Sequence, residues 1–418
     1  MAARGGYPTP MLNWIWAAFI FVAFLTALGR AATGDAEGFR AIVGALFESA
    51  KTAFEIALGL TGVMALWLGM MRVGEKGGVV EGIARLFGPL FRRIFPGVPA
   101  GHPAAGAMVM NMAANVMGLD NAATPLGLKA MKELQALNPE PDRATDDMIM
   151  FLVINASSIT VLPVTIFTFR AQLGAADPTD VFVPILIATW CSTFAGLVVT
   201  GLVQRLKLWQ PVVLGWIGLL TALVAGLVAH FARLPEAEVA RQAAILANFL
   251  VLAVVVLFLA AAARRRAPLF ETFVEGAKEG FQVAVSIIPY LVAMLVAVGA
   301  LRASGALDFL LDGVRAGVTG LGLDARWVDG LPTALMKPLS GSGARGLMID
   351  TMKTLGPDSF GGRLACVIQG STETTFYVLA VYFGSVGVKR TRHAVGCALA
   401  AEAAGVIAAI AVSYLFFG

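Results

Sequence analysis

Long uncharged runs of apolar residues recur along the chain, separated by short polar segments. Runs of about twenty residues have the length that an α-helix needs to cross the hydrocarbon core of a bilayer. The predicted spanning segments are residues 11–29, 53–71, 148–169, 181–204, 208–232, 242–263, 280–301, 364–388 and 393–417. No small-residue cleavage signature precedes Arg30, so we interpret the first run as a retained helix rather than a signal peptide. The pattern predicts an all-α polytopic membrane protein with about nine transmembrane helices.

Two regions interrupt this pattern, at residues 72–147 and 302–363. Each runs through an amphipathic segment, then an apolar piece rich in Gly, Ala, Met and Ser that polar residues and proline interrupt, then a short helical piece. A total of nine crossings requires that each of these two regions begins and ends on the same side of the membrane. We therefore expect two interrupted or re-entrant hairpin regions, with an interfacial position as the alternative.

Segments of the second half repeat segments of the first. Residues 48–58 match residues 275–285, and residues 154–160 match residues 368–374, in the same order. Predicted spans one and six are five crossings apart, an odd number, so the two halves form inverted-topology repeats. Interrupted helices at matching places in such repeats are typical of secondary transporters with a site near the midplane. Duplication that only stabilises the bundle is the alternative.

The repeat divides the chain into three parts. The predicted domains are residues 1–207 as the first repeat, residues 208–241 as a linking helix and loop, and residues 242–418 as the second repeat. Lys and Arg cluster at residues 205–207, 264–266 and 389–392, between predicted spans. Because cytoplasmic loops carry an excess of these residues, we expect a cytoplasmic N-terminus.

Composition excludes a soluble globular domain. Of 418 residues, 58% are hydrophobic and 14% are charged, whereas a soluble domain carries roughly 25% charged residues. The mean hydropathy is +0.79. A net charge of +4 arises from 31 Lys and Arg against 27 Asp and Glu. Since these cations lie mostly in loops, they favour membrane orientation and give no reason to expect a nucleic-acid partner.

Cysteine and histidine residues do not form a recognisable reactive or metal-binding pattern. Cys191, Cys366 and Cys397 lie inside apolar stretches without C-x-x-C spacing, which favours buried structural thiols over disulfides or zinc ligands. The three histidines lie far apart, and no nucleophile and base have a usable spacing. We expect neither an enzyme nor a bound cofactor or metal, apart from a coupling Na⁺ or proton.

Polar residues in the first interrupted segment are the first candidates for a site. They are Asn111, Asn115, Asp120, Asn121 and Thr124. Asn111 and Asn115 are four residues apart and share one helical face. Pro125 has no N–H and disfavours helix at Thr124, so a helix breaks or begins here. With Asp120 or Asn121 as N-cap, backbone donors would face a cavity, and simple capping in an interfacial loop is the alternative.

The second interrupted segment is rich in glycine and serine around one arginine. Its candidate residues are Ser340, Ser342 and Arg345. A G-x-G-x-x-G pattern at residues 341–346 follows no predicted strand, so we discount dinucleotide binding. An unwound stretch here would expose amides and hydroxyls, and Arg345 can bind a carboxylate through two hydrogen bonds. An internal pair of Arg345 with Asp350 or Glu373 is the alternative.

Two predicted spans carry polar runs at matching places. The third carries Asn155, Ser157 and Ser158, and the eighth carries Gln369, Ser371, Thr372, Glu373 and Thr374. Single hydroxyls in apolar helices often bond to the preceding turn, which is a structural role. Glu373 is costly in hydrocarbon, so we interpret it as a proton carrier, a cation ligand or a counter-ion to Arg345. Glu402 in the ninth span is a weaker candidate.

At these residues the chain resembles a fusion of the bacterial spore maturation proteins A and B, members of the Gate or nucleoside-recognition family. The first half resembles protein A at residues 111–115 and 119–127, and the second resembles protein B at residues 337–346 and 369–375. The family is similar to the gating halves of nucleoside permeases, ferrous-iron permeases and a spore dipicolinate transporter. The resemblance implies transport without fixing a substrate.

The sequence thus favours a secondary active transporter coupled to a proton or sodium gradient. The expected solute is small, polar and organic and carries a carboxylate, as in an amino acid, a dipeptide, a dicarboxylate or a nucleoside-like compound. Its expected partners are the lipid bilayer and this solute, and a homodimer is left open. The alternative is a non-transporting membrane scaffold or regulator of envelope or spore maturation, in which the polar runs only join helices.

Overall fold

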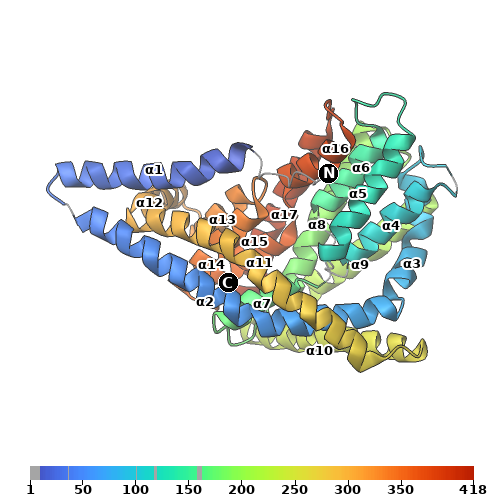
Figure 1. Ribbon diagram of the computed structural model, residues 1–418, viewed down its shortest axis with the longest axis horizontal. Coiled ribbons are helices and arrows are strands. Elements are labelled where there is room, and N and C mark those ends of the chain that lie inside the picture. The colour runs from blue at the N-terminus through green and yellow to red at the C-terminus, as the bar shows by residue number, and fades with distance from the viewer. Residues whose placement is uncertain (1–9, 36, 100, 117–119, 158–161) are drawn as a thin grey trace.

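The computed structural model describes residues 10–35, 37–99, 101–116, 120–157 and 162–418, which are almost entirely helical (Figure 1). The helices of the first half are α1 (Pro10–Ala32), α2 (Glu37–Lys76), α3 (Val79–Ile94), α4 (Pro103–Val116), α5 (Asp120–Ala136), α6 (Asp146–Ser157), α7 (Val164–Gln172) and α8 (Phe182–Val203). Those that follow are α9 (Pro211–Phe231), α10 (Glu236–Arg264), α11 (Leu269–Ala303), α12 (Ala306–Gly320), the 3₁₀ helix η1 (Arg326–Gly330), α13 (Leu331–Met336), α14 (Gly341–Leu355), α15 (Phe360–Ser371), α16 (Thr375–Val386) and α17 (Ala394–Phe417). The predicted all-α membrane fold is confirmed.

Within the described residues, seven helical segments are long and apolar enough to cross a membrane. They are α1, α2, α8, α9, α10, the α15–α16 segment and α17. An eighth is the α11–α12 pair, which bends by 67° where Gly305 adopts a left-handed φ of 81°. Each of the nine predicted spans contains helix in its described residues, but residues 148–169 are not among these candidate spans, so the count of nine stays a prediction.

The third and eighth predicted spans are each broken into two helices. α6 ends at Ser157 and α7 begins after Pro163, which has no N–H to continue a helix. α15 and α16 are separated at residues 372–374, where Thr372 has an extended backbone. The Glu373 N–H in this break donates to the carbonyl of Ala156 at 2.8 Å, so the α15–α16 break contacts the last turn of α6.

Both interrupted regions form several shorter helices, as the sequence predicts. The first contains α3, α4 and α5, and the second contains α12, η1, α13 and α14. α5 begins at Asp120, so a new helix starts close to the predicted place. Pro125 lies inside this helix and does not end it. Whether these regions re-enter the membrane stays a prediction.

The longest helices, α2 and α11, contain the matching segments 48–58 and 275–285 and lie side by side (Figure 1). They run antiparallel: Ser49 lies near Gly299, and Arg72 pairs with Glu275 at 2.6 Å. Between these points Gly280 lies so close to the α2 backbone that a Cβ there would be 2.6 Å from the Ala65 Cα. This glycine allows the two backbones to touch. The inverted-repeat relation itself stays a prediction.

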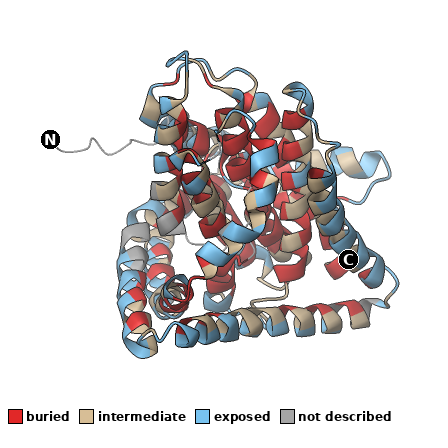
Figure 2. Ribbon diagram, turned by 90° about the vertical axis from the view of Figure 1, so that its right-hand side faces the viewer, coloured by how far each residue is buried: buried red, intermediate tan, exposed pale blue. Residues whose placement is uncertain are grey.

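Burial follows the arrangement expected in a bilayer. Figure 2 shows buried residues concentrated in the middle of the bundle and exposed residues on the outer helices. Large apolar side chains are exposed on these outer helices, including Phe21 on α1 (63%), Leu219 on α9 (61%) and Phe249 on α10 (65%). Apolar surface of this kind is solvated by lipid, so the chain is a multi-pass membrane protein.

Candidate functional site

A cavity of about 360 Å³ lies where the two broken helices and the two interrupted regions meet. Its walls come from both halves of the chain. The first half contributes α4, α5, α6, α7 and the segment before α7, and the second contributes the α13–α14 turn, α14, α15, α16 and the break between them. Predicted candidates in its lining are Asn115, Thr124, Asn155, Arg345, Gln369, Thr372 and Glu373.

Three side chains form a hydrogen-bond network on one wall. Asn115 donates to the Oδ1 atom of Asn155 at 2.7 Å, and the Tyr382 hydroxyl donates to the same oxygen at 3.2 Å. Asn155 in turn donates to the carbonyl of Phe151 at 2.8 Å, which fixes its orientation. Since Tyr382 comes from α16 and the two asparagines from α4 and α6, this network joins the two halves.

Asn111 lies behind this wall and does not line the cavity. It is fully buried, and its Nδ2 atom donates to the Ala123 carbonyl at 2.7 Å and lies 3.4 Å from the Tyr382 hydroxyl. Its Oδ1 atom has no hydrogen-bond partner among the described residues. Asn111 therefore ties α4 to the start of α5 and supports Tyr382.

Two cationic side chains, Lys337 and Arg345, also line the cavity. The Arg345 guanidinium lies over the Phe169 ring at 5.8 Å from its centre, a cation–π contact. Asp350, one of the two alternative partners, accepts hydrogen bonds from Arg302 at 2.6 and 2.8 Å. Gly341, the first residue of α14, is also in the lining, so a helix N-terminus faces the cavity.

Polar side chains in and just before the break between α15 and α16 have hydrogen-bonding capacity that no described residue uses. Gln369 and Thr372 are 9% and 1% exposed, and their Oε1 and Oγ1 atoms have no partner among the described residues. Both side chains line the cavity, whereas Glu373 lines it with an exposed side chain. Unsatisfied buried polar atoms are rare in native structures and call for a water, ion or ligand.

Five further candidates, which the structure does describe, do not line the cavity. Ser157 donates to the carbonyl of Ile154 at 3.0 Å, Ser371 donates to the carbonyl of Ile368 at 2.8 Å, and Ser340 caps α14 by accepting from the Gly343 N–H at 3.0 Å. Ser342 lies 3.2 Å from the Ser340 hydroxyl. Thr374 is 2% exposed, without a partner for its hydroxyl in the described residues.

Three predicted candidates cannot be placed at the cavity. Ser158 lies outside the described residues. Asp120 and Asn121 begin α5, but their side chains lie outside the described part of the chain.

The sequence did not single out several lining residues. Lys337, Phe169, Tyr377 and Tyr382 line the cavity but were not among the candidates. Lys337 was detectable, since it is a cation next to Pro338 in an apolar segment. The aromatic residues carried no such signal, because tyrosine and phenylalanine are ordinary in membrane helices.

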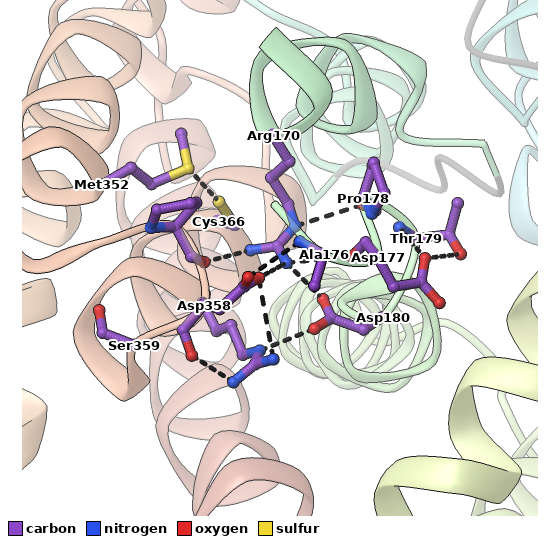
Figure 3. A network of polar contacts seen from close by, with 12 residues as sticks. Arg170, Ala176, Asp177, Pro178, Thr179, Asp180, Met352, Asp358, Ser359 and Cys366 are labelled. Carbon is purple, nitrogen blue, oxygen red and sulfur yellow. Dashed lines mark hydrogen bonds and ion pairs between the residues drawn. The ribbon is translucent and has the colours of Figure 1, made fainter. Parts of the chain in front are cut away.

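A second polar cluster lies at the end of α7, where it joins the two halves (Figure 3). Arg170 is fully buried and donates to the carbonyl of Pro357 at 2.6 Å and to Asp358 at 3.0 Å. It also forms an ion pair with Asp180 at 2.8 Å, and Arg363 donates to the same carboxylate at 2.7 Å. Burial raises the pKa of Asp180, and the two arginines oppose this shift.

Comparisons with known proteins cover both halves of the chain. The profile of the Gate family, described as nucleoside recognition, matches residues 57–173 and 284–389. Spore maturation protein B of Bacillus subtilis is 50% identical over 154 residues, which are 37% of this chain and 85% of that protein. Spore maturation protein A of the same organism is 35% identical over 189 residues, which are 45% of this chain and 93% of that protein. A crystal structure of the Alcanivorax borkumensis YdaH transporter matches with a TM-score of 0.40 and 17% identity, covering 95% of this chain and 97% of that one.

Proposed function

The chain belongs to the Gate, or nucleoside recognition, family, and from this premise we propose that it is a membrane transporter for a small polar organic solute. The observation that carries the proposal is the cavity between the broken helices α6–α7 and α15–α16. Its volume of about 360 Å³ lies within the roughly 300–1,000 Å³ of small-molecule sites. Irregular backbone at membrane depth is tolerated where it lines a cavity, and secondary transporters bind their solutes at such breaks.

The solute in this proposal carries a carboxylate, as in an amino acid, a dipeptide or a dicarboxylate. Arg345 and Lys337 supply two positive charges to the cavity lining, and the N-terminus of α14 adds a partial positive charge. An arginine can hold a carboxylate through two parallel hydrogen bonds. The partnerless Gln369 and Thr372 oxygens would accept from donor groups of the same solute.

Transport would be coupled to a proton or sodium gradient across a bacterial cytoplasmic membrane. No nucleotide-binding P-loop pattern occurs in the sequence, so an ion gradient is the simplest energy source for accumulation. Glu373 is the carboxylate that lines the cavity, and cation coordination at an unwound helix is the usual arrangement in secondary transporters.

The names of the relatives favour a second candidate, a scaffold or regulator of envelope or spore maturation that does not transport. Both relatives are named for spore maturation. In that case the Asn115, Asn155 and Tyr382 network would serve only to join helices. A scaffold would bind no solute in the cavity, whereas a transporter must bind one.

The first experiment is a binding screen on the detergent-purified protein. Ligands that bind only the native state raise its apparent thermal stability. We would test nucleosides, amino acids, dipeptides and dicarboxylates, with and without sodium and at several pH values. Arg345→Gln should abolish the shift given by a carboxylate ligand, whereas Arg315→Gln on α12, outside the cavity lining, should retain it.

Uptake into proteoliposomes then separates transport from binding. A carboxylate that stabilises the protein should be taken up, and Arg345→Gln should reduce its uptake to the background of empty liposomes. A screen with no stabilising ligand would favour the scaffold. Uptake that is unchanged in Arg345→Gln would refute the assigned site.

A further inference from the structure

Glu402 on α17 is a buried carboxylate that does not line the cavity. It is 4% exposed. Its Oε2 atom accepts from the Thr375 hydroxyl at 2.6 Å, and its Oε1 atom has no partner among the described residues. Ionised carboxylates within membrane helices are costly unless they face a partner, and they often mark proton pathways.

The surroundings of Glu402 are polar but contain few charges. α8 places Ser192 beside the carbonyl of Ala401 at 2.9 Å, and Thr372, after α15, faces Gly405 one turn farther along α17. The Phe376 N–H donates to the Pro338 carbonyl at 3.0 Å, so Lys337 lies next to the start of α16, where Thr375 binds Glu402. At Glu402 the positive charge of Lys337 opposes the negative charge of Glu373.

Lys337 links this carboxylate to the cavity. Lys337 is 3% exposed and also lines the cavity, so the same positive charge lies near both the space for a solute and the Thr375–Glu402 hydrogen bond. A solute carboxylate that binds in the cavity would compete with Glu402 for this positive charge. Opposite charges interact strongly at low dielectric, so the loss of Lys337 to the solute would favour neutral, protonated Glu402.

Resting on the proposed function, we infer that Glu402 carries the coupling proton and that Lys337 transmits solute binding to it. As the solute anion enters, one proton from the same aqueous side binds to Oε1 of Glu402. Both leave on the other side: the solute releases Lys337, and the ammonium again stabilises ionised Glu402. A monocarboxylate and one proton together carry no net charge, so the step is electroneutral.

A proton suits this position better than sodium. A sodium ion at Glu402 would lie beside the fixed charge of Lys337 and would require several oxygen ligands. A proton neutralises the carboxylate without a ligand shell. The Thr375 hydroxyl can donate a hydrogen bond to the ionised carboxylate and can accept one from the protonated carboxyl group. Sodium is therefore the competing outcome of the test.

The test uses the full-length protein in proteoliposomes with a carboxylate found in the binding screen. One pH unit across the membrane should drive about tenfold accumulation in the wild type, since tenfold corresponds to one unit of proton activity. Glu402→Gln, which imitates the protonated group, should lose this accumulation but retain solute exchange across the membrane. Glu140→Gln in an exposed loop is the matched control and should accumulate as the wild type does.

A second measurement needs only the wild type, so it remains decisive if Glu402→Gln does not fold. Adding the carboxylate to the protein in weakly buffered detergent solution should raise the pH, because the protein takes up a proton with the solute. Solute binding in detergent without proton uptake, or accumulation in proteoliposomes driven by sodium alone, would overturn this inference while leaving transport intact. Absence of any solute binding would instead overturn the proposed function.

Discussion

Arg170 shows how a single buried side chain can hold distant segments together. Its guanidinium contacts Pro357 and Asp358, which precede α15, and Asp180, which precedes α8. A buried arginine is favourable only while all its acceptors are present, because removing one member of the cluster leaves the charge of another without a partner. The cluster therefore behaves as one unit that joins the two halves near the cavity.

We expect Arg170→Met to destabilise the protein strongly, by about 3–5 kcal/mol, because the Asp180 and Asp358 carboxylates lose their buried partner. Arg241→Met, at an exposed ion pair with Glu238, is the control and should change stability by less than about 1 kcal/mol. Thermal unfolding in detergent measures both. Equal effects of the two substitutions would show that the Arg170 cluster contributes no more than a surface pair.

Asp147 predicts a dependence of stability on pH. Burial raises its pKa to about 6 from 3.8, although the Gly97 N–H opposes the shift. Because the folded-state pKa is the higher one, the protonated form favours folding. This contribution is complete below about pH 4 and is lost as the pH rises through about 6. A shift of about two pKa units changes the free energy of unfolding by at most about 3 kcal/mol.

Asp147→Asn should therefore unfold at a higher temperature than the wild type at pH 8, and the difference should vanish near pH 4. Asp146→Asn is the matched control, because the neighbouring Asp146 forms an exposed ion pair with Arg392 at 2.7 Å. It should show no such gain at pH 8. An Asp147→Asn variant without a gain at pH 8 would contradict the assigned shift.

The sequence predicted those site residues whose chemistry is out of place in a membrane. Asn155, Arg345 and Glu373 line the cavity and were detectable because polar groups in apolar runs need a reason. Ser157 and Ser371 are equally polar, but they bond to their own helices. Sequence alone could not separate the two groups, since the separation depends on which side of the helix faces the break.

At the scale of elements, contact between α2 and α11 depends on small residues. A Cβ at Gly280 would lie 2.6 Å from the N and Cα atoms of Ala65, and backbone atoms cannot move aside as a flexible side chain can. A Cβ at Gly62 on α2 would meet nothing within 4 Å. The same substitution at the two positions therefore tests the helix contact separately from helix propensity.

We expect Gly280→Ala to destabilise the protein by about 1–3 kcal/mol through overpacking. Gly62→Ala should be neutral or slightly stabilising, because alanine favours helix by up to about 1 kcal/mol over glycine. The apparent melting temperatures in detergent measure both variants. If Gly280→Ala were as stable as Gly62→Ala, the close approach of α2 and α11 would be wrong.

Helices were more predictable than the places where they break. Each of the nine predicted spans contains helix in its described residues, because apolar length is read directly from the sequence. The break at residues 372–374 was not predicted, since no proline or glycine lies there. The Glu373 N–H bonds to Ala156 instead of to its own helix, and such a contact between distant segments leaves no local signal.

At the scale of the whole molecule, neither half encloses the cavity. The first half contributes Asn115 and Asn155, and the second contributes Lys337, Arg345 and Tyr382. The two relatives are separate proteins that each cover less than half of this chain. Because α2 packs on α11 and α8 on α17, the halves present large complementary surfaces to each other.

We therefore predict that residues 1–207 and 208–418, expressed together as two chains, assemble in the membrane. An affinity tag on one chain should recover the other, and the pair should bind the same carboxylate as the intact protein. Each chain alone should bind none, because Asn115 and Asn155 would lie on one chain and Tyr382, Lys337 and Arg345 on the other. A second chain that carries Gly280→Leu is the control and should recover less partner, since Gly280 lies against the α2 backbone. Solute binding by either chain alone would contradict a site shared between the halves, and failure of the pair to assemble would show that the α8–α9 connection is itself required.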